Sequence, residues 1–412
     1  MSALRGVTVG ITAAALVALG GCVLGPTALQ VSRVRYNEVI QQTRKEQMLL
    51  NLVRLQYREE PLFLDVGSVA TQFTFAQAAG VEASINEGPT SFNPDSLGLN
   101  LDVGLEEKPT ITLAPLQGRD FVTRLLAPMQ PEVILLLSRT GWRVDRVLRL
   151  TVQGMNGLEN AASASGPTPA QVPPFREFVR VTRLLRELQK QGLLEFGFEP
   201  SVSDVSTPVP TEKVGLPEMV DALSEGYGLR QTEDGRNLVL TQSSKSLVWR
   251  IGPSAAESPE AAEIVTLLGL KPGQSSYKVR LGVTNGKPTE AAGQRSEITL
   301  TTRSLLGTLF YLSQAIDVPA EHRRKGYVTT TVDEDGTEFA WAELMGDLLR
   351  VHSSPAKPSS TAVQVRFWGY WYYIDNADLS SKSTLALLGQ LLALQAGGAD
   401  IVTPVLTLPV GG

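Results

Sequence analysis

Apolar residues along this chain follow helical spacing in some segments and alternate with polar residues in others, so both helices and strands are predicted. In residues 36–58, apolar positions recur every three or four residues, which is typical of an amphipathic helix, and Pro61 ends the segment. Residues 175–191 repeat this spacing and stop at Gly192, a favourable residue after a helix C-terminus. Further helices are predicted after Pro131, from Pro217, over 259–268, from Ser304 and over 380–395.

Strands are predicted where apolar residues alternate with polar ones or form short runs. Residues 63–75 predict one or two strands, residues 97–116 a hairpin of their own, and residues 142–155 a strand. Residues 228–242 predict a second hairpin that turns at Asp234-Gly235. Shorter strands are predicted at 193–200, 246–251, 276–283, 296–304 and 404–410. Because helices and strands mix without a regular βαβ alternation, we expect an α+β fold with mixed, mostly antiparallel sheets and packed helices, in two to three domains.

Six of the seven residues from Phe367 to Tyr373 are aromatic, in a chain that is only 6% aromatic. A two-residue turn at Trp368-Gly369 folds this segment into a hairpin, because Gly369 supplies the positive φ that such turns need. The register then places an apolar and aromatic set on one face: Val363, Val365, Phe367, Tyr370, Tyr372 and Ile374. The other face pairs Arg366 with Trp371 and Gln364 with Tyr373, and we expect Arg366 to lie over the Trp371 ring as a cation–π pair.

Three aromatic residues lie outside the apolar face of this hairpin: Trp368, Trp371 and Tyr373. They are the candidate binding residues, since exposed aromatic rings suit a glycan or a peptide. The alternative is that the same rings pack on a neighbouring sheet or domain.

The composition limits the chemistry. The chain has 412 residues and a formal net charge of −5, with acidic and basic residues mixed along its length, so it lacks the basic field of a nucleic-acid-binding protein. Its one cysteine and two histidines, His322 and His352, do not suggest a tetrahedral zinc site. No cofactor is expected, and His352 is predicted to be an exposed strand residue.

Short motifs that resemble catalytic or metal-binding signatures have simpler explanations. Two Ser-x-x-Lys matches lie in a predicted strand and in a proline loop, whereas that chemistry needs one turn of a helix. The acidic run 333–336 predicts a hairpin turn rather than a calcium loop. Asp375 and Asp378 are possible cation ligands, but a turn followed by a helix that Ser380 or Ser381 caps is favoured. No catalytic residue is therefore assigned.

The N-terminus carries the most specific motif. Arg5 precedes an uncharged, mostly apolar run from Val7 to Leu19, which is shorter than the roughly 20 residues of a membrane-spanning helix and fits a signal peptide. Leu19-Gly20-Gly21-Cys22 ends this run with small residues before the single cysteine. These four residues resemble the lipobox of bacterial lipoproteins.

The resemblance implies that Cys22 receives a diacylglycerol on its thiol, that a peptidase cuts before it, and that acyl chains hold the protein at a membrane. In lipoproteins an aspartate after the cysteine often retains the protein in the inner membrane, and the residue here is Val23. The expected location is therefore the outer membrane, on its periplasmic face. An ordinary secretory signal with a chance cysteine is the alternative.

Segments rich in proline, glycine and small residues predict two linkers that divide the mature chain. The expected division is a lipoprotein signal peptide at 1–21, a lipidated tether at 22–35, an N-terminal α+β domain at 36–160, a linker at 161–174, a middle α+β domain at 175–283, a linker at 284–295 and a C-terminal α+β domain at 296–412 with the aromatic hairpin.

Two segments are similar to an uncharacterised family of bacterial envelope lipoproteins: YNEVIQQTRKEQMLLNLVRLQYREEPLFLDV (36–66) and GYWYYIDNADLSSKSTLALLGQLLAL (369–394). The similarity implies an envelope location and brings no known activity. The expected role is a lipid-anchored periplasmic binding or scaffold protein of a transport, secretion or polymer-export assembly, with an envelope protein as partner. The alternative is a periplasmic hydrolase or transferase that acts on glycans or lipids through carboxylates that converge in the fold.

Overall fold

The computed structural model describes residues 33–83, 97–167, 169, 171–251, 258–282, 293–396 and 406–409. It confirms the predicted α+β class, because helices accompany mostly antiparallel sheets. Met48–Pro61 and Val122–Gln395 form one compact unit, the large unit. The described parts of Met1–Gln47, Leu62–Phe121 and Ala396–Gly412 form the small unit. The large unit contains residues from all three expected domains.

The small unit contains a three-stranded antiparallel sheet. β1 (Leu64–Ala83) pairs with β2 (Leu97–Pro115) along its length, and β14 (Leu406–Pro409) pairs with the end of β2. The hairpin expected within residues 97–116 is wrong, because this segment is one strand whose partner is β1.

Lys108 and Pro109 lie inside the ladder of β2, with Pro109 opposite Thr71. β14 reaches only to Thr110, so at Pro109 the described neighbour of β2 is β1 alone. Such an edge position tolerates proline, because no N–H is needed on the open side.

The predicted helix at 36–58 is confirmed, since residues 33–56 are helical. Its C-terminal part, from Met48, belongs to the large unit. Four of the apolar residues that define its predicted stripe are buried: Leu49, Leu52, Val53 and Leu55.

The large unit contains an eight-stranded sheet in the order β4-β3-β10-β9-β8-β5, with β6 and β7 paired to β8. β9 and β10 run parallel to each other, and the other pairs are antiparallel. The strands are β3 (Val152–Met155), β4 (Leu158–Glu159), β5 (Leu194–Asp204), β6 (Val209–Pro210), β7 (Tyr227–Gln231), β8 (Asn237–Ile251), β9 (Ser276–Leu281) and β10 (Glu297–Thr302).

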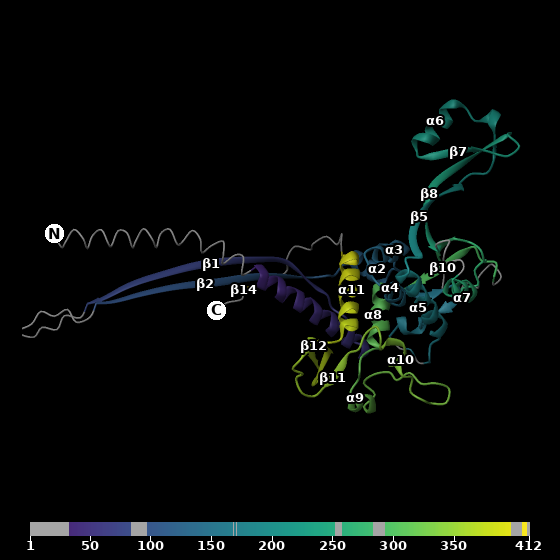
Figure 1. Cartoon of the computed structure of the whole chain (residues 1–412). Coiled ribbons are helices and arrows are strands. Elements are labelled where there is room, and N and C mark those ends of the chain that lie inside the picture. Colours follow the sequence, from purple (N-terminus) through teal and green to yellow (C-terminus); the bar gives the residue numbers. More distant parts are fainter. Residues whose placement is uncertain are drawn as a thin grey trace, which may run out of the picture. The chain divides into compact units, whose positions relative to one another are not determined.

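β8 takes the place of two predicted strands. The hairpin at 228–242 is confirmed, and its turn contains Gly235 with a φ of 71°. The segment 246–251 is not a separate strand, because β8 continues through the polar residues before it. Residues 238–242 pair with β7 and residues 241–251 pair with β5, so the ladder exchanges its partner without a break. Figure 1 shows β5 and β8 as a long ribbon that carries β7 and α6.

The predicted helices are confirmed, and two of them, α7 and α8, begin after a serine whose side chain caps the helix. Ser304 caps α8, because its Oγ accepts the N–H of Gly307 at 3.0 Å. The helices are α2 (Arg119–Leu126), α3 (Pro131–Arg139), α4 (Val144–Thr151), α5 (Arg176–Lys190), α6 (Leu216–Ser224), α7 (Pro259–Leu267), α8 (Leu305–Ser313), α9 (Ala320–Arg324), α10 (Trp341–Met345) and α11 (Leu379–Ala396).

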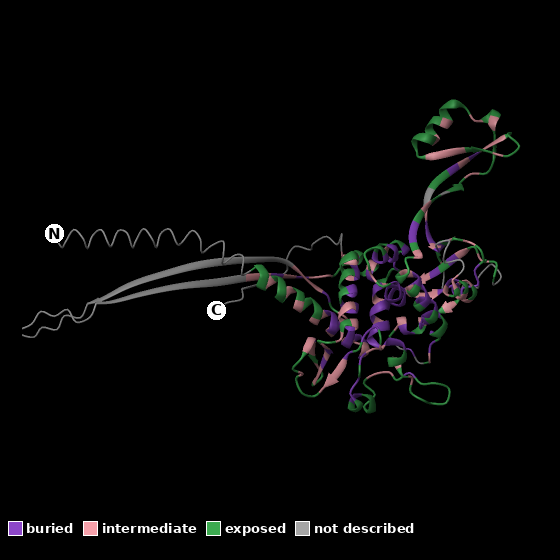
Figure 2. Ribbon diagram, viewed as in Figure 1, coloured by how far each residue is buried: buried purple, intermediate pink, exposed green. Residues whose placement is uncertain are grey.

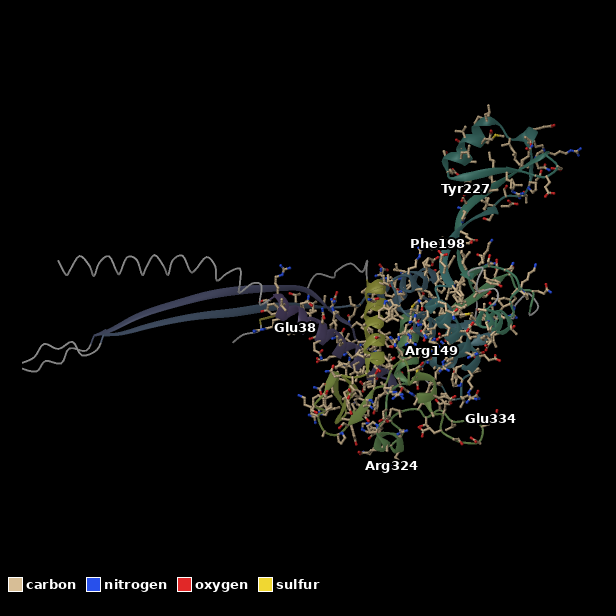
Figure 3. The ribbon with its side chains drawn as sticks, viewed as in Figure 1. Glu38, Arg149, Phe198, Tyr227, Arg324 and Glu334 are labelled. Carbon is tan, nitrogen blue, oxygen red and sulfur yellow. The ribbon has the colours of Figure 1, made fainter. Side chains whose placement is uncertain are left out.

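The strand predicted over residues 142–155 is wrong, since this segment forms α4 and then the short strand β3. Arg143, Arg146 and Arg149 recur every three residues, which is helical spacing. All eight residues of α4 are buried, including two of these arginines. Arg149 is compensated by Asp347, which accepts two of its N–H groups at 2.7 and 2.8 Å. Figure 3 shows Arg149 within the large unit, whereas Arg324 and Glu334 lie at its surface.

Arg303 joins the end of α4 to its surroundings. Its guanidinium is fully buried and donates to the carbonyl oxygens of Arg149 and Val152 at 3.0 and 2.7 Å. It also donates to Asn160 O and, at 2.8 Å, to Ser165 Oγ, and lies 4.0 Å over the Tyr311 ring. Burial lowers the pKa of Arg303 to about 10, so the group is still charged at neutral pH.

The segment expected as a linker at 161–174 packs against the large unit where it is described. Residues 162–165 form a 3-10 helix, and Ala161 and Ala164 are buried. The N–H of Ala161 donates to the carbonyl of Pro174 at 2.9 Å, which closes the segment on itself. Most of the other expected linker, 284–295, lies outside the described residues.

A three-stranded sheet in the order β11 (His352–Ser354), β13 (Tyr370–Asp375) and β12 (Thr361–Phe367) precedes α11. The helix cap expected at Ser380 or Ser381 is instead Asp378. Its carboxylate accepts the backbone N–H of Ser381 at 2.9 Å and the Ser381 hydroxyl at 2.6 Å. Aspartate is as good an N-cap as serine, and here it lies one position before the helix.

Candidate functional site

The aromatic run forms the hairpin that its alternation predicted. β12 and β13 are antiparallel, with Phe367 opposite Tyr370 and Val365 opposite Tyr372. The face expected to be apolar provides the buried residues of this hairpin: Val363, Tyr372 and Ile374. Phe367 is half-buried, so it contributes less to the core than Tyr372.

Trp368 occupies a left-handed backbone conformation at the tip of the hairpin. Its φ is 44° and that of Gly369 is 86°, the positive pair typical of a type I′ turn. Glycine adopts this conformation freely, whereas a bulky residue does so at a cost of about 1 kcal/mol or more. The indole stacks on the Phe367 ring with centroids 5.8 Å apart and is 50% exposed. Strain of this kind at a half-exposed tryptophan is typical of a functional surface.

Three polar groups form a hydrogen-bonded chain beneath this tip. Tyr57 Oη lies 2.6 Å from Nδ1 of His322 and 2.6 Å from the hydroxyl of Tyr372. Tyr57 comes from the end of the helix of residues 33–56, His322 from α9 and Tyr372 from β13. The chain therefore ties two segments that are distant in sequence to the hairpin.

Burial keeps these groups uncharged. It raises the pKa of Tyr57 and of Tyr372, and it lowers the pKa of His322, a residue that is only 5% exposed. Donation from Tyr372 to Tyr57 and from Tyr57 to Nδ1 gives both hydroxyl protons an acceptor. The arrangement is that of a satisfied buried network, which holds rings in a fixed position.

The exposed part of the cluster is a pair of rings, Trp368 and Tyr327, which we name the Trp–Tyr face. The two centroids lie 5.2 Å apart with the planes at 82°, and Tyr327 is 41% exposed. His322 packs under both rings, with centroid distances of 6.3 Å to Trp368 and 5.5 Å to Tyr327. Lys325 lies 5.8 Å over the Tyr327 ring, so a cation borders the face.

The structure separates the three candidate residues. Trp368 belongs to the Trp–Tyr face, whereas Trp371 and Tyr373 alternate with the buried residues of β13 and therefore lie on the other side of the sheet. The cation expected over Trp371 is not Arg366, because Lys357 occupies that position at 5.4 Å from the ring. Tyr373 contacts His352, with ring centroids 5.4 Å apart, and His352 is half-buried rather than exposed as predicted.

Sequence reasoning missed Tyr57, His322 and Tyr327 as partners of the hairpin. The signal for a hairpin was local alternation, which says nothing about the elements that pack on it. His322 follows Glu321 in a charged segment, so its burial has no local pattern to announce it.

A groove of about 680 Å³ lies beside the cluster and shares its elements. Three of its lining residues, Gln56, Arg323 and Val328, are sequence neighbours of Tyr57, His322 and Tyr327. Its charged lining residues are Asp317, Arg323, Glu338 and Arg350, so acidic and basic groups balance. A ring pair, Phe339 and Trp341, lines it with centroids 4.9 Å apart.

The remaining candidates from the sequence are the lipidation site, the acidic turn and possible metal ligands. Cys22 and the lipobox lie outside the described residues. The turn expected at 333–336 is confirmed, because the N–H of Asp333 donates to the carbonyl of Thr337 at 2.8 Å. Within the described ranges, no group of three or more His, Cys, Asp and Glu side chains is placed to hold a metal ion.

Comparison with protein-family models, with curated proteins and with solved structures gave no match. In the part of the chain that the structure describes, no helix combines the length and the apolar character that crossing a membrane requires.

Proposed function

We propose that this protein is a lipid-anchored binding or scaffold protein of the bacterial envelope, located at the periplasmic face of the outer membrane, and that it binds an envelope protein through the Trp–Tyr face. The observation that carries the proposed binding face is Trp368, which is half-exposed and strained yet braced by other rings. The lipobox-like motif Leu19-Gly20-Gly21-Cys22 supports the anchor. Tryptophan and tyrosine dominate the energetics of protein interfaces, because they bury much area with few rotatable bonds.

The cluster lowers the cost of binding. Tyr57 contacts the Trp368 ring at a centroid distance of 5.5 Å, and its hydroxyl is fixed by His322 and Tyr372. Rings held in place before contact lose little side-chain entropy when a partner covers them. This supports binding by a preformed surface.

The test replaces the exposed rings and preserves the fold. Trp368→Asn creates Asn-Gly, the dipeptide that type I′ turns favour, so the hairpin is retained while the indole is lost. Tyr327→Ala removes the second ring. Phe198→Ala is the matched control, because Phe198 is 40% exposed and lies on β5. Each variant is expressed in a strain that lacks the protein, and the phenotype and the protein level are measured.

We expect Trp368→Asn and Tyr327→Ala to fail to restore the phenotype at normal protein levels, and Phe198→Ala to restore it. If both ring variants restore it fully, the Trp–Tyr face is not the binding surface. If a folded Asp or Glu variant in the groove behaves like the deletion, the alternative, a hydrolase or transferase acting on glycans or lipids, gains support.

The anchor has its own test. Cys22→Ser is expected to abolish incorporation of a fatty-acid analogue and to leave the uncleaved precursor in the cell, because the thiol is the acceptor in the lipobox reaction. Equal labelling of the wild type and the variant would contradict the lipid anchor.

A further inference from the structure

The groove lies where a short hairpin opens. The N–H of Phe339 donates to the carbonyl of Thr331 at 2.9 Å, and Val332 bridges to Glu338. Beyond these pairs, no hydrogen bond between described residues joins the two arms. Residues 328–330 on one arm and 340–342 on the other line the groove.

The arm at 328–330 has backbone groups available for pairing. Within the described ranges, no hydrogen bond involves the N–H or C=O of Val328, Thr329 or Thr330. Among the described residues, the hydrogen bond of this run joins the Arg58 guanidinium to the Thr329 hydroxyl and does not involve the main chain of 328–330. Unpaired main chain next to a groove is a template for an added strand.

The lining favours an uncharged ligand with apolar side chains. Arg323 is paired with Glu338 at 3.0 Å, and Asp317 balances Arg350, so a polyanion finds no net attraction. The Phe339 and Trp341 rings offer an apolar contact opposite the arm at 328–330. A groove of about 680 Å³ is in the range that accommodates a short peptide or a drug-sized ligand.

We propose that this groove binds an extended peptide segment of a partner protein, which adds as a strand to residues 328–330 and places an apolar side chain against Phe339 and Trp341. Main-chain hydrogen bonds then supply affinity, and the rings supply specificity. The site is distinct from the Trp–Tyr face, and its occupancy does not require that face to bind.

The test uses the full chain in detergent and a phage library of random linear peptides as the probe. Peptides enriched on the wild type are synthesised, and their affinities are measured by fluorescence anisotropy. Ala342→Trp fills the groove from an exposed lining position, and Ala262→Trp, at an exposed position of α7, is the matched control. We expect Ala342→Trp to weaken binding by about ten-fold or more and Ala262→Trp to change it by less than about three-fold.

A second pair of variants tests strand addition itself. Thr330→Pro removes one backbone donor, whereas Thr330→Ala removes the side chain and keeps that donor. We expect about ten-fold weaker binding for Thr330→Pro and less than about three-fold change for Thr330→Ala. Amide exchange at 328–330 should slow when the peptide is bound, a readout that needs no variant.

Several results would overturn the proposal. The first is that no peptide is enriched on the wild type relative to Ala342→Trp. The second is that both proteins bind the peptides equally, and the third is that amide exchange at 328–330 is unchanged when the peptide is bound. Because these readouts measure peptide binding and not the phenotype, they can fail while the Trp–Tyr face succeeds, and the reverse.

Discussion

α4 and α6 are helices of similar length, but the more polar one, α4, is buried and the more apolar one, α6, is exposed. α4 carries Asp145, Arg146 and Arg149, yet all its residues are buried. α6 is richer in apolar residues, yet none of its residues is buried, and Leu216 is 78% exposed. Figure 2 shows that α6 is largely exposed, whereas helices packed inside the same unit are largely buried. Composition alone therefore does not reveal burial in this protein: α4 is buried because its polar groups find partners, whereas the apolar side chains of α6 are exposed.

One of the two largest expected effects comes from the groups that satisfy α4. Arg303→Met leaves the Asn160 carbonyl without its charged donor and removes the bonds to Arg149 O and Val152 O. We expect the free energy of unfolding to fall by about 3–4 kcal/mol. An unsatisfied buried carbonyl at Asn160 costs about 1–3 kcal/mol, and the charge-assisted bonds to Arg149 O and Val152 O are also lost, although the Asn160 amide still donates to both oxygens. Chemical denaturation measures this change. A loss below about 1 kcal/mol would show that packing around α4, and not this network, decides its burial.

Substitutions on the two faces of the aromatic hairpin should also differ in how much they lower the free energy of unfolding. Tyr372→Ala removes a buried ring and its bond to Tyr57, so we expect a loss of about 3–5 kcal/mol. Trp371→Ala on the other face should cost clearly less, and Phe367→Ala should fall between them. Ranking the three unfolding free energies checks the register. If Trp371→Ala is the most destabilising, the assignment of the faces is wrong.

The buried histidine predicts a smaller, pH-dependent effect. Burial lowers the pKa of His322 below the value of about 6.5 in an unfolded chain, so below that pH the unfolded state binds more protons than the folded state. Stability should therefore fall as the pH drops through about 6.5. His322→Asn keeps a polar partner for Tyr57 and removes the titration.

Denaturation of both proteins between about pH 7.5 and about pH 5 gives the comparison. The wild type should lose more stability on acidification than His322→Asn. Parallel losses in the two proteins would mean that His322 does not contribute to the pH dependence.

The smallest effect is expected on α6. Leu216→Ser and Val220→Ser should change the free energy of unfolding by less than about 0.5 kcal/mol, since both side chains are exposed. A substantial loss in thermal or chemical denaturation would show that α6 is buried in the protein in solution, and would remove the contrast with α4.

Local sequence signals predicted the elements that depend only on residues near them in the sequence. The hairpin register from Val363 to Ile374 needed only alternation and a glycine at the turn, and the start of α8 needed only the capping serine at 304. The long pairing of β1 with β2 depends on a partner outside residues 97–116, so the local pattern of that segment predicts a hairpin that does not form.

α4 was missed for a different reason. Its arginines looked like the polar side of a strand, and only their distant partners, such as Asp347 and Ser380, make burial of a helix possible. The candidate site shows the same limit. Trp368 was identifiable from its own neighbours, whereas Tyr327 and the groove depend on which segments the fold brings together.

The most direct test of the proposed binding face is photo-crosslinking in living cells with benzoyl-phenylalanine at position 327, compared with position 198. We predict a light-dependent adduct of defined mass at 327 that disappears when Trp368→Asn is added to the same chain, and no such adduct at 198. No adduct at 327, or an adduct that Trp368→Asn leaves unchanged, would contradict the proposal that the Trp–Tyr face binds a partner.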